Sequence, residues 1–244
     1  MNKIYVVGIG PGEYEQMTIR AAKTLESCDT IIGYGVYVNL IKDNFPGKEF
    51  LTTPMTKEAE RCTLAFEEAA KGKTVSVICS GDAGIYAMAG LMYEIGKNYP
   101  EAELEIICGV TAAISGAAAL GAPLANDFCV ISLSDLLTPR QQIETRLKAA
   151  VYGDFAVCLY NPQSRRRKDY LAWAADIMLS EGKSPETVCG IARNIGREGE
   201  SIRVMSLAGL RETPADMFTT VFIGSSKTEE INGKMVAPRG YKNI

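Results

Sequence analysis

The stretch Val6-Val7-Gly8-Ile9-Gly10-Pro11-Gly12 decides how the chain folds. It continues the apolar, β-branched run at residues 4–7, which is typical of a strand, and ends that run in a glycine-rich turn. Such a turn lets the backbone approach a ligand closely. The spacing is GxGxG, whereas a dinucleotide fingerprint is GxGxxG, and Pro11 lacks the N–H that a pyrophosphate would use. NAD and FAD are therefore disfavoured. A purely structural turn and a turn that lines another ligand both stay open.

Short β-rich runs alternate with helical patterns along the rest of the chain, which indicates an α/β fold. We expect strands at residues 30–32, 74–79, 104–108, 129–133, 155–160, 187–192, 201–205 and 219–224. Helices are expected at residues 18–27, 58–71, 86–96, 139–150 and 165–181, and a helix of small residues after Gly109. That small-residue segment leads to Gly121-Ala122-Pro123. We expect the boundary between two α/β domains in this region, with residues 1–112 in the N-terminal domain and residues 113–244 in the C-terminal domain. The polar tail after residue 227 is expected to be loose.

The composition limits the classes of function. With 47% apolar and 23% charged residues among 244, the chain is expected to form a packed globular protein. A net charge of −3 argues against broad electrostatic binding to nucleic acid or to an anionic membrane. The sequence contains no histidine, which excludes Ser–His–Asp and Cys–His catalysis and histidine metal ligands.

Seven cysteines, at positions 28, 62, 79, 108, 129, 158 and 189, form no CxxC pair. Most of them lie in or beside apolar runs, so we expect buried thiols, no metal site and a reducing, cytoplasmic compartment. The uncharged stretch at residues 106–126 is long enough to span a bilayer, but it is rich in alanine and glycine and has few large apolar residues. We therefore expect a buried helix there and no association with a membrane.

Polar and glycine-rich segments follow several of the predicted strands. They are Ser80-Gly81-Asp82-Ala83-Gly84, Gly109-Val110-Thr111-Ala112-Ala113, Tyr160-Asn161-Pro162 and Arg193-Asn194-Ile195-Gly196-Arg197. In open α/β sheets, ligands bind at the carboxyl ends of the strands. Asp82 would offer a carboxylate to hydroxyls or to a cation, or would cap the next helix, and both roles can hold at once.

Residues 165–168 are four consecutive cations near a predicted helix start, where they oppose the helix dipole. A polycarboxylate or phosphate ligand would explain their presence, and so would a solvated basic surface. Both explanations stay open from the sequence.

Taken in order and spacing, the segments at residues 7–12, 80–82, 109–113 and 219–224 resemble those of the tetrapyrrole methylase superfamily. Its members methylate porphyrinoid intermediates with S-adenosyl-L-methionine. The segments at residues 33–37, 81–90, 131–139, 159–162 and 192–194 are similar to those of the C17-methyltransferases, which act on a precorrin-3B-type macrocycle and contract its ring in cobalamin biosynthesis. The alternatives are a superfamily methyltransferase with another substrate, such as another precorrin carbon, a diphthamide precursor or rRNA, and a non-catalytic nucleotide-binding module.

The resemblance implies an N-terminal parallel sheet, a C-terminal mixed sheet, a cofactor cleft between the two domains and a homodimer. It implies binding of S-adenosyl-L-methionine, with S-adenosyl-L-homocysteine as product, by Pro11, Ser80, Gly81, Asp82, Ile85, Thr111, Ala112, Tyr160, Asn161, Ala192 and Thr220. Ser134 and Asp135 are the candidates for moving protons. The expected partner is a tetrapyrrole, not nucleic acid, and the expected substrate contacts are Tyr34, Ser132, Arg193 and Asn194, with Arg197 and the cations at 165–168 near its carboxylates.

Overall fold

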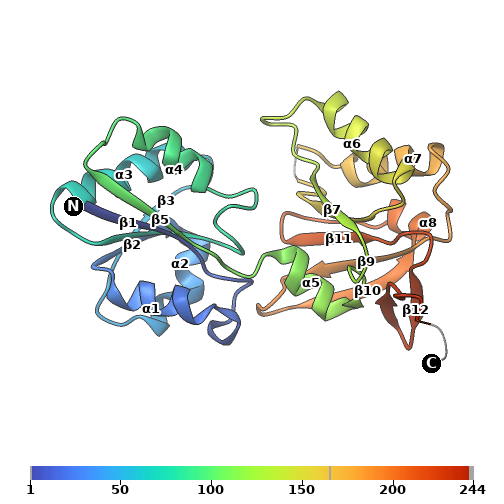
Figure 1. Cartoon of the computed structure of the whole chain (residues 1–244), viewed down its shortest axis with the longest axis horizontal. Helices are drawn as coiled ribbons and strands as arrows, with labels where there is room; N and C mark the ends of the chain where they lie inside the picture. The colour runs from blue at the N-terminus through green and yellow to red at the C-terminus, as the bar shows by residue number, and fades with distance from the viewer. Residues whose placement is uncertain (1, 165, 242–244) are drawn as a thin grey trace. The chain divides into compact units, whose positions relative to one another are not determined.

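The computed structural model describes residues 2–164 and 166–241, coloured along the chain in Figure 1. The chain divides into two compact units, residues 1–112 and 113–244. Each unit is an α/β structure built around its own five-stranded sheet. Arg165, the first of the four predicted cations, lies outside the described residues.

The first unit is built on a sheet in which all strand pairs are parallel, as predicted. The strand order is β3-β2-β4-β1-β5. The strands are β1 (Asn2–Gly8), β2 (Thr30–Tyr34), β3 (Glu49–Thr53), β4 (Val75–Cys79) and β5 (Ala102–Ile107). All five residues of the central strand β4 are buried, which explains its continuous apolar sequence.

Helices cover both faces of this sheet (Figure 1). They are α1 (Ile19–Ser27), α2 (Gly35–Ile41), α3 (Glu58–Ala70) and α4 (Ala89–Gly96), with short 3₁₀ turns at Tyr14–Gln16 and Lys42–Asn44. Successive side chains of a strand point to opposite faces of the sheet, so those of β1 belong to two different hydrophobic cores. Val6 packs with α3 and α4, and its neighbour Val7 packs with α1 and α2. Thr18 caps α1, because its hydroxyl accepts a hydrogen bond from the Ala21 N–H at 3.1 Å.

Two features of the first unit differ from the expectations from the sequence: the start of α4 and the presence of strand β3 at the edge of the sheet. The helix expected from residue 86 begins at Ala89, since Tyr86 has a left-handed backbone with φ 51°. Strand β3 was missed because it is a short edge strand with a partly exposed sequence.

The second unit contains a mixed sheet, also as predicted, in the order β10-β9-β11-β8-β7. Its strands are β7 (Phe128–Ser132), β8 (Ala156–Tyr160), β9 (Val188–Arg193), β10 (Ser201–Ser206) and β11 (Thr219–Ile223). Only the pair β7–β8 is parallel among these described strands, and the other three pairs are antiparallel.

Three helices pack on one face of this mixed sheet: α6 (Arg140–Tyr152), α7 (Tyr170–Ser180) and α8 (Leu207–Arg211). The small-residue helix α5 (Ala112–Leu120) packs elsewhere on the sheet, where a Cβ at Gly116 would lie 2.9 Å from the Phe222 ring. In the described residues, no helix is long and apolar enough to cross a membrane. The helix expected from residue 165 begins at Tyr170, so the described cations Arg166–Lys168 precede it in a loop.

The expectation of a loose tail after residue 227 is wrong. Strands β12 (Glu229–Ile231) and β13 (Lys234–Val236) form a hairpin, and β13 pairs in parallel with β6 (Gly121–Ala122). Met235 is fully buried in this small sheet. A short polar segment thus gains its order from one buried side chain and from pairing with a strand more than a hundred residues earlier, which local sequence does not reveal.

Five cysteines are buried as expected, at positions 28, 62, 79, 158 and 189. Burial raises the pKa of Cys28 and Cys79 to about 11 and that of Cys62 and Cys189 to about 12, so these thiols are protonated at neutral pH. Cys129 is half-buried, and Cys108 is exposed, which contradicts the expectation of burial for that residue.

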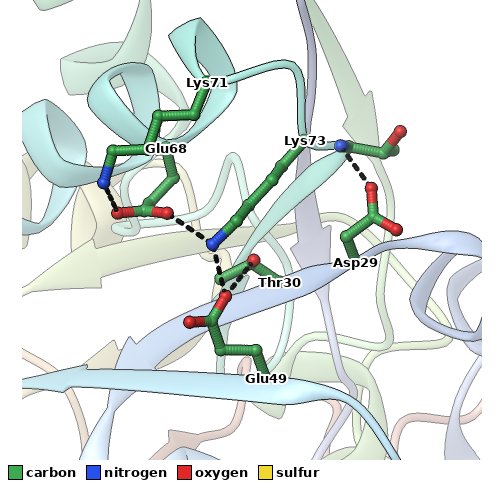
Figure 2. A network of polar contacts seen from close by, with 7 residues as sticks. Asp29, Thr30, Glu49, Glu68, Lys71 and Lys73 are labelled. Atoms are coloured by element: carbon green, nitrogen blue, oxygen red, sulfur yellow. Dashed lines mark hydrogen bonds and ion pairs between the residues drawn. The ribbon is translucent and has the colours of Figure 1, made fainter.

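A network of ion pairs closes the amino-terminal edge of the first sheet (Figure 2). The buried carboxylate of Glu68, in α3, accepts hydrogen bonds from Lys71 Nζ at 2.5 Å and from Lys73 Nζ at 2.8 Å. Lys73 also reaches Glu49 at 2.7 Å, and Glu49 accepts from the Thr30 hydroxyl at 2.7 Å. These bonds hold the pKa of Glu68 and of Glu49 below the usual range, through Lys71 and Lys73 respectively.

We expect Glu68→Gln to lower the melting temperature at pH 7 by a few degrees, because it removes the charge that Lys71 and Lys73 share. A carboxyl group whose pKa is lower in the folded state stabilises the protein above its unfolded pKa, and this contribution is lost as the pH falls through the folded pKa. The difference between the wild type and Glu68→Gln should therefore shrink on acidification. Thermal unfolding followed by circular dichroism checks this, with the exposed neighbour substitution Glu67→Gln as the control. A difference that is constant with pH would contradict the ion-pair explanation.

Candidate active site

Three chain segments meet at the carboxyl edge of the first sheet, after β1, β4 and β5. The Gly10 N–H donates to the Gly81 carbonyl at 3.1 Å, and the Gly81 N–H donates to the Gly10 carbonyl at 2.8 Å. A Cβ at Gly109 would lie 2.1 Å from the Gly81 carbonyl oxygen, and one at Gly8 would lie 2.6 Å from the same atom. Neither distance is possible for a real side chain, so glycine is required at both positions. The glycine-rich turn therefore has a structural role of its own beside any ligand.

Asp82 links two of these segments through its carboxylate. Its Oδ1 accepts a hydrogen bond from the Gly84 N–H at 2.8 Å, and its Oδ2 accepts one from the Gly109 N–H at 2.9 Å. Of the two roles considered for Asp82, that of helix cap is not found, because Met88 holds the N-cap position of α4. Each carboxylate oxygen has capacity for another donor, so Asp82 can hold the two segments together and still bind a ligand.

The structure brings the other predicted residues of this unit to the same edge. Ser80 and Gly81 follow β4, Pro11 follows the paired Gly10, and Thr111 lies close enough that a Cβ on Gly81 would be 3.5 Å from its Cα. Ala112 comes next in the chain and begins α5. Ile85 is 43% exposed on the turn before α4, which leaves an apolar surface available at this edge.

Tyr34, a predicted substrate contact, ends β2 at the same edge. Its ring meets the ring of Tyr37 edge to face, with the ring centres 5.3 Å apart. Because β2 and β4 are parallel neighbours, the Tyr34 end of β2 lies at the same edge of the sheet as Ser80, which follows β4.

In the second unit, the predicted residues gather at one edge of the mixed sheet. Ser132 and Tyr160 are paired in register at the carboxyl ends of β7 and β8, and Ala192 is opposite Thr220 in the pair β9–β11. Asn161 Nδ2 donates to the Ser132 hydroxyl at 3.0 Å. Asn161 and Asn194 have φ of 53° and 51°, a left-handed conformation that asparagine tolerates better than most residues.

Tyr160 also fixes the start of helix α5. Its hydroxyl accepts a hydrogen bond from the Ala113 N–H at 2.8 Å. This bond satisfies one of the free N–H groups at the beginning of the helix.

Ser134 and Asp135, the predicted proton-moving pair, are held by two residues that the sequence did not indicate for this role. Arg167 Nη1 donates to the Ser134 hydroxyl at 3.1 Å and to Asp135 Oδ1 at 3.3 Å. The Tyr170 hydroxyl donates to Asp135 Oδ2 at 2.6 Å. The hydrogen bonds from Tyr170 and Arg167 hold the pKa of Asp135 below its usual range, so this carboxylate is ionised at neutral pH and is a weak base.

The basic run therefore divides into different environments. Arg167 is mostly buried against Asp135, while Arg166 and Lys168 are exposed. The run was recognised in the sequence, but the partner of Arg167 lies more than thirty residues earlier and only the fold brings it close.

Arg193 and Asn194 lie at the end of β9. Arg193 Nε forms an ion pair with Asp216 Oδ2 at 2.8 Å. Burial opposes ionisation of Asp216, but hydrogen bonds from Arg193 and Thr219 outweigh it and hold the pKa of Asp216 below its usual value. The Asn194 N–H donates to the Phe218 carbonyl at 3.1 Å, which fixes the loop after the strand.

Comparison with known proteins identifies the family. The model of the Tetrapyrrole (Corrin/Porphyrin) Methylases matches residues 3–211. This chain belongs to the tetrapyrrole methylase family. It is 44% identical over 237 residues, 97% of this chain and 98% of the relative, to a Salmonella typhimurium protein named "Probable cobalt-factor III C(17)-methyltransferase". It is 38% identical over 229 residues, 92% of this chain and 89% of the relative, to the precorrin-3B C(17)-methyltransferase of a Sinorhizobium species.

The fold of this tetrapyrrole methylase is similar to that of the methyltransferase CobJ, whose crystal structure is known. The two structures have a TM-score of 0.88 and 36% sequence identity, over 96% of this chain and 99% of the other. The similarity therefore covers both sheets and the edges that carry the predicted residues.

We expect Tyr170→Phe to raise the pKa of Asp135 toward the usual aspartate range, because the substitution removes the hydrogen bond that contributes most to lowering it. Nuclear magnetic resonance titration of the aspartate carboxyl carbons measures this. The control is Tyr152→Phe, on the neighbouring helix, since Tyr152 is 96% exposed. An unchanged Asp135 titration in Tyr170→Phe would show that the described hydrogen bond does not form in solution.

Proposed function

We propose that this chain is an S-adenosyl-L-methionine-dependent C-methyltransferase that methylates C17 of a precorrin-3B-type macrocycle, with ring contraction, in cobalamin biosynthesis. The observation that carries the proposal is the similarity along 97% of the chain to a relative named as a C17-methyltransferase. The alignment with the Sinorhizobium relative, named for the cobalt-free substrate, supports the same reaction at the same carbon.

The residues at the edge of the first sheet fit the cofactor. S-adenosyl-L-methionine carries ribose hydroxyls, an amino-acid group and an apolar adenine, and each needs a different partner. The Asp82 carboxylate suits hydroxyls or an ammonium group, the glycine backbones allow close approach, and exposed Ile85 offers an apolar surface. When bound, the cofactor would supply an activated methyl group on its sulfonium.

We further propose that residues of both sheets bind the cofactor. Those of the first unit are Pro11, Ser80, Gly81, Asp82, Ile85, Thr111 and Ala112, and those of the second are Tyr160, Asn161, Ala192 and Thr220. Their task is to orient the methyl group and exclude water, because an electron-rich macrocycle carbon needs no protein nucleophile. A protein without histidine is suited to such a reaction.

The substrate contacts in this proposal come mainly from the second unit. Ser132, Arg193 and Asn194, together with Tyr34 of the first unit, would contact the macrocycle. Its carboxylates would pair with Arg193 and with the exposed Arg166 and Lys168. Leu136 and Leu137, 73% and 98% exposed on the loop after β7, would contact its flat apolar surface.

Asp135 and Ser134 remain our candidates for moving protons during ring contraction. Because Asp135 is ionised and held by Arg167 and Tyr170, we propose that it orients a polar group of the macrocycle and accepts a proton only from a strong acid. Ser134 shares the same arginine and can donate from its hydroxyl. A homodimer, which the family resemblance implies, and a cytoplasmic location, which the free cysteines in apolar runs favour, are also part of the proposal.

We expect anaerobic incubation with methyl-labelled S-adenosyl-L-methionine and macrocycle to transfer one labelled methyl group to the macrocycle. Cobalt-free precorrin-3B and cobalt-containing cobalt-factor III form two arms, read by mass spectrometry, with the position of the label assigned by nuclear magnetic resonance. Label at C17 in either arm supports the proposal and identifies the metal state of the substrate. The proposed function would be wrong if the enzyme binds the cofactor but labels neither macrocycle, or labels a carbon other than C17.

We expect Asp82→Ala to weaken binding of S-adenosyl-L-homocysteine at least tenfold, about 1.4 kcal/mol. The substitution removes the carboxylate and leaves the Gly84 and Gly109 N–H groups without their acceptor. Isothermal titration calorimetry measures the affinity. Asp29→Ala is a matched control, because Asp29 also accepts a backbone hydrogen bond, from the Thr74 N–H at 2.8 Å, but at the opposite edge of the sheet (Figure 2). Equal affinities for Asp82→Ala and the wild type would remove Asp82 from the cofactor site.

A further inference from the structure

Arg61 is a buried cation that has no carboxylate partner among the residues that the structure describes. It lies in the first turn of α3 and is only 4% exposed. Its guanidinium donates from Nη2 to the Pro54 carbonyl at 3.0 Å and to the Thr53 carbonyl at 3.4 Å. Nη1 contacts the Met88 sulfur at 3.2 Å, and Nε has no hydrogen-bond partner among the described residues.

This placement is unfavourable for stability alone. A buried charge that is not paired with an opposite charge costs free energy, and a cation in the first turn of a helix also opposes the helix dipole. The only acceptors of Arg61 in the described chain are two carbonyls and a thioether, which compensate less than a carboxylate would. An apolar side chain of similar size would cost less free energy at this position. The contacts that Arg61 makes therefore indicate a role other than stabilising the fold.

Those contacts connect two segments at the carboxyl edge of the first sheet. Thr53 and Pro54 end strand β3 and begin the loop before α3, in which Thr56 has a strained φ of 67°. Met88 is the N-cap residue of α4 and ends the turn that follows β4. One planar guanidinium with several donors can hold both segments at once, which a lysine ammonium on a flexible chain does poorly.

The segment that ends at Met88 begins with the predicted cofactor residues. Ser80, Gly81, Asp82 and Ile85 all lie between β4 and α4. The segment also closes on itself, since the Ala89 N–H donates to the Ala83 carbonyl at 3.0 Å. Fixing Met88 therefore restricts the positions of Asp82 and Ile85 as well.

We propose that Arg61 is a positioning residue for cofactor binding: it ties the end of β3 to Met88 and thereby fixes the turn that carries Asp82 and Ile85. Arg61 itself touches no cofactor in this arrangement. The proposal rests on the proposed function for the identity of the ligand, whereas the clamp between the two segments does not.

Two substitutions test the clamp. Arg61→Met keeps an unbranched chain without donors, and Arg61→Lys keeps the charge without the planar fork. We expect both to weaken binding of S-adenosyl-L-homocysteine at least tenfold in calorimetry, below their unfolding temperatures. We also expect faster hydrogen–deuterium exchange of the amides at residues 83–89. Full wild-type affinity in Arg61→Lys would show that the charge and not the bridge matters, and would overturn the proposal.

Glu68→Gln is the matched control, because Glu68 is a buried charged residue of the same helix at the opposite edge of the sheet. It should lower the melting temperature but leave both the cofactor affinity and the exchange at residues 83–89 unchanged. If Glu68→Gln weakens binding as much as Arg61→Met for an equal loss of melting temperature, Arg61 acts only through stability and the proposal fails.

A milder variant covers the case in which Arg61→Met does not fold. Met88→Leu keeps the volume and removes the sulfur contact, and we expect it to weaken binding severalfold with the same local increase in exchange. Unchanged exchange and affinity in this variant would contradict the role of Met88. A wild type that does not bind S-adenosyl-L-homocysteine would defeat the proposed function, whereas the exchange measurements would still decide whether the clamp exists.

Discussion

The close approach of three backbones, at Gly8, Gly81 and Gly109, is the constraint on which the first unit depends. A side chain at Gly8 or Gly109 would collide with the Gly81 carbonyl, and Gly81 itself has a left-handed backbone with φ 68°, which favours glycine. The backbone pairing of Gly10 with Gly81 and the two hydrogen bonds to Asp82 then fix the loops in place. The predicted cofactor residues of the first unit lie on or beside these loops, so the same packing that completes this unit also positions them.

The two edges of the first sheet use charge differently, and helix α3 takes part in both. At the amino-terminal edge, Glu68 is neutralised by two lysines, an arrangement that supports stability (Figure 2). At the carboxyl edge, the acceptors of Arg61 in the described part of the chain are two carbonyls and a sulfur, and Asp82 accepts hydrogen bonds from backbone N–H groups. The buried Glu68 carboxylate is thus paired with opposite charges, whereas the Asp82 carboxylate keeps acceptor capacity at the edge where ligands of open α/β sheets bind.

The sequence predicts most of the architecture, because apolar runs such as residues 75–79 and the glycine turns that follow them are local signals. The sequence predicts the structure less accurately where a segment is ordered by contacts with residues that are distant in the chain. The pairing of β13 with β6, the bond from Gly109 to Asp82 and the contact of Arg167 with Asp135 all join residues far apart in the chain. Arg61 reads in the sequence as an ordinary surface residue of a helix, and only its burial marks it as unusual.

The distribution of the thiols makes the protein suitable for a spectroscopic reporter. Of the seven cysteines, all of which the structure describes, only Cys108 is exposed. It directly precedes Gly109, and its carbonyl accepts a hydrogen bond from the Thr18 hydroxyl at 3.2 Å. A maleimide dye would attach at Cys108 faster than at the buried thiols, whose burial disfavours the reactive thiolate. The native chain thus offers an attachment point for fluorescence beside the loops discussed above, without any engineered cysteine.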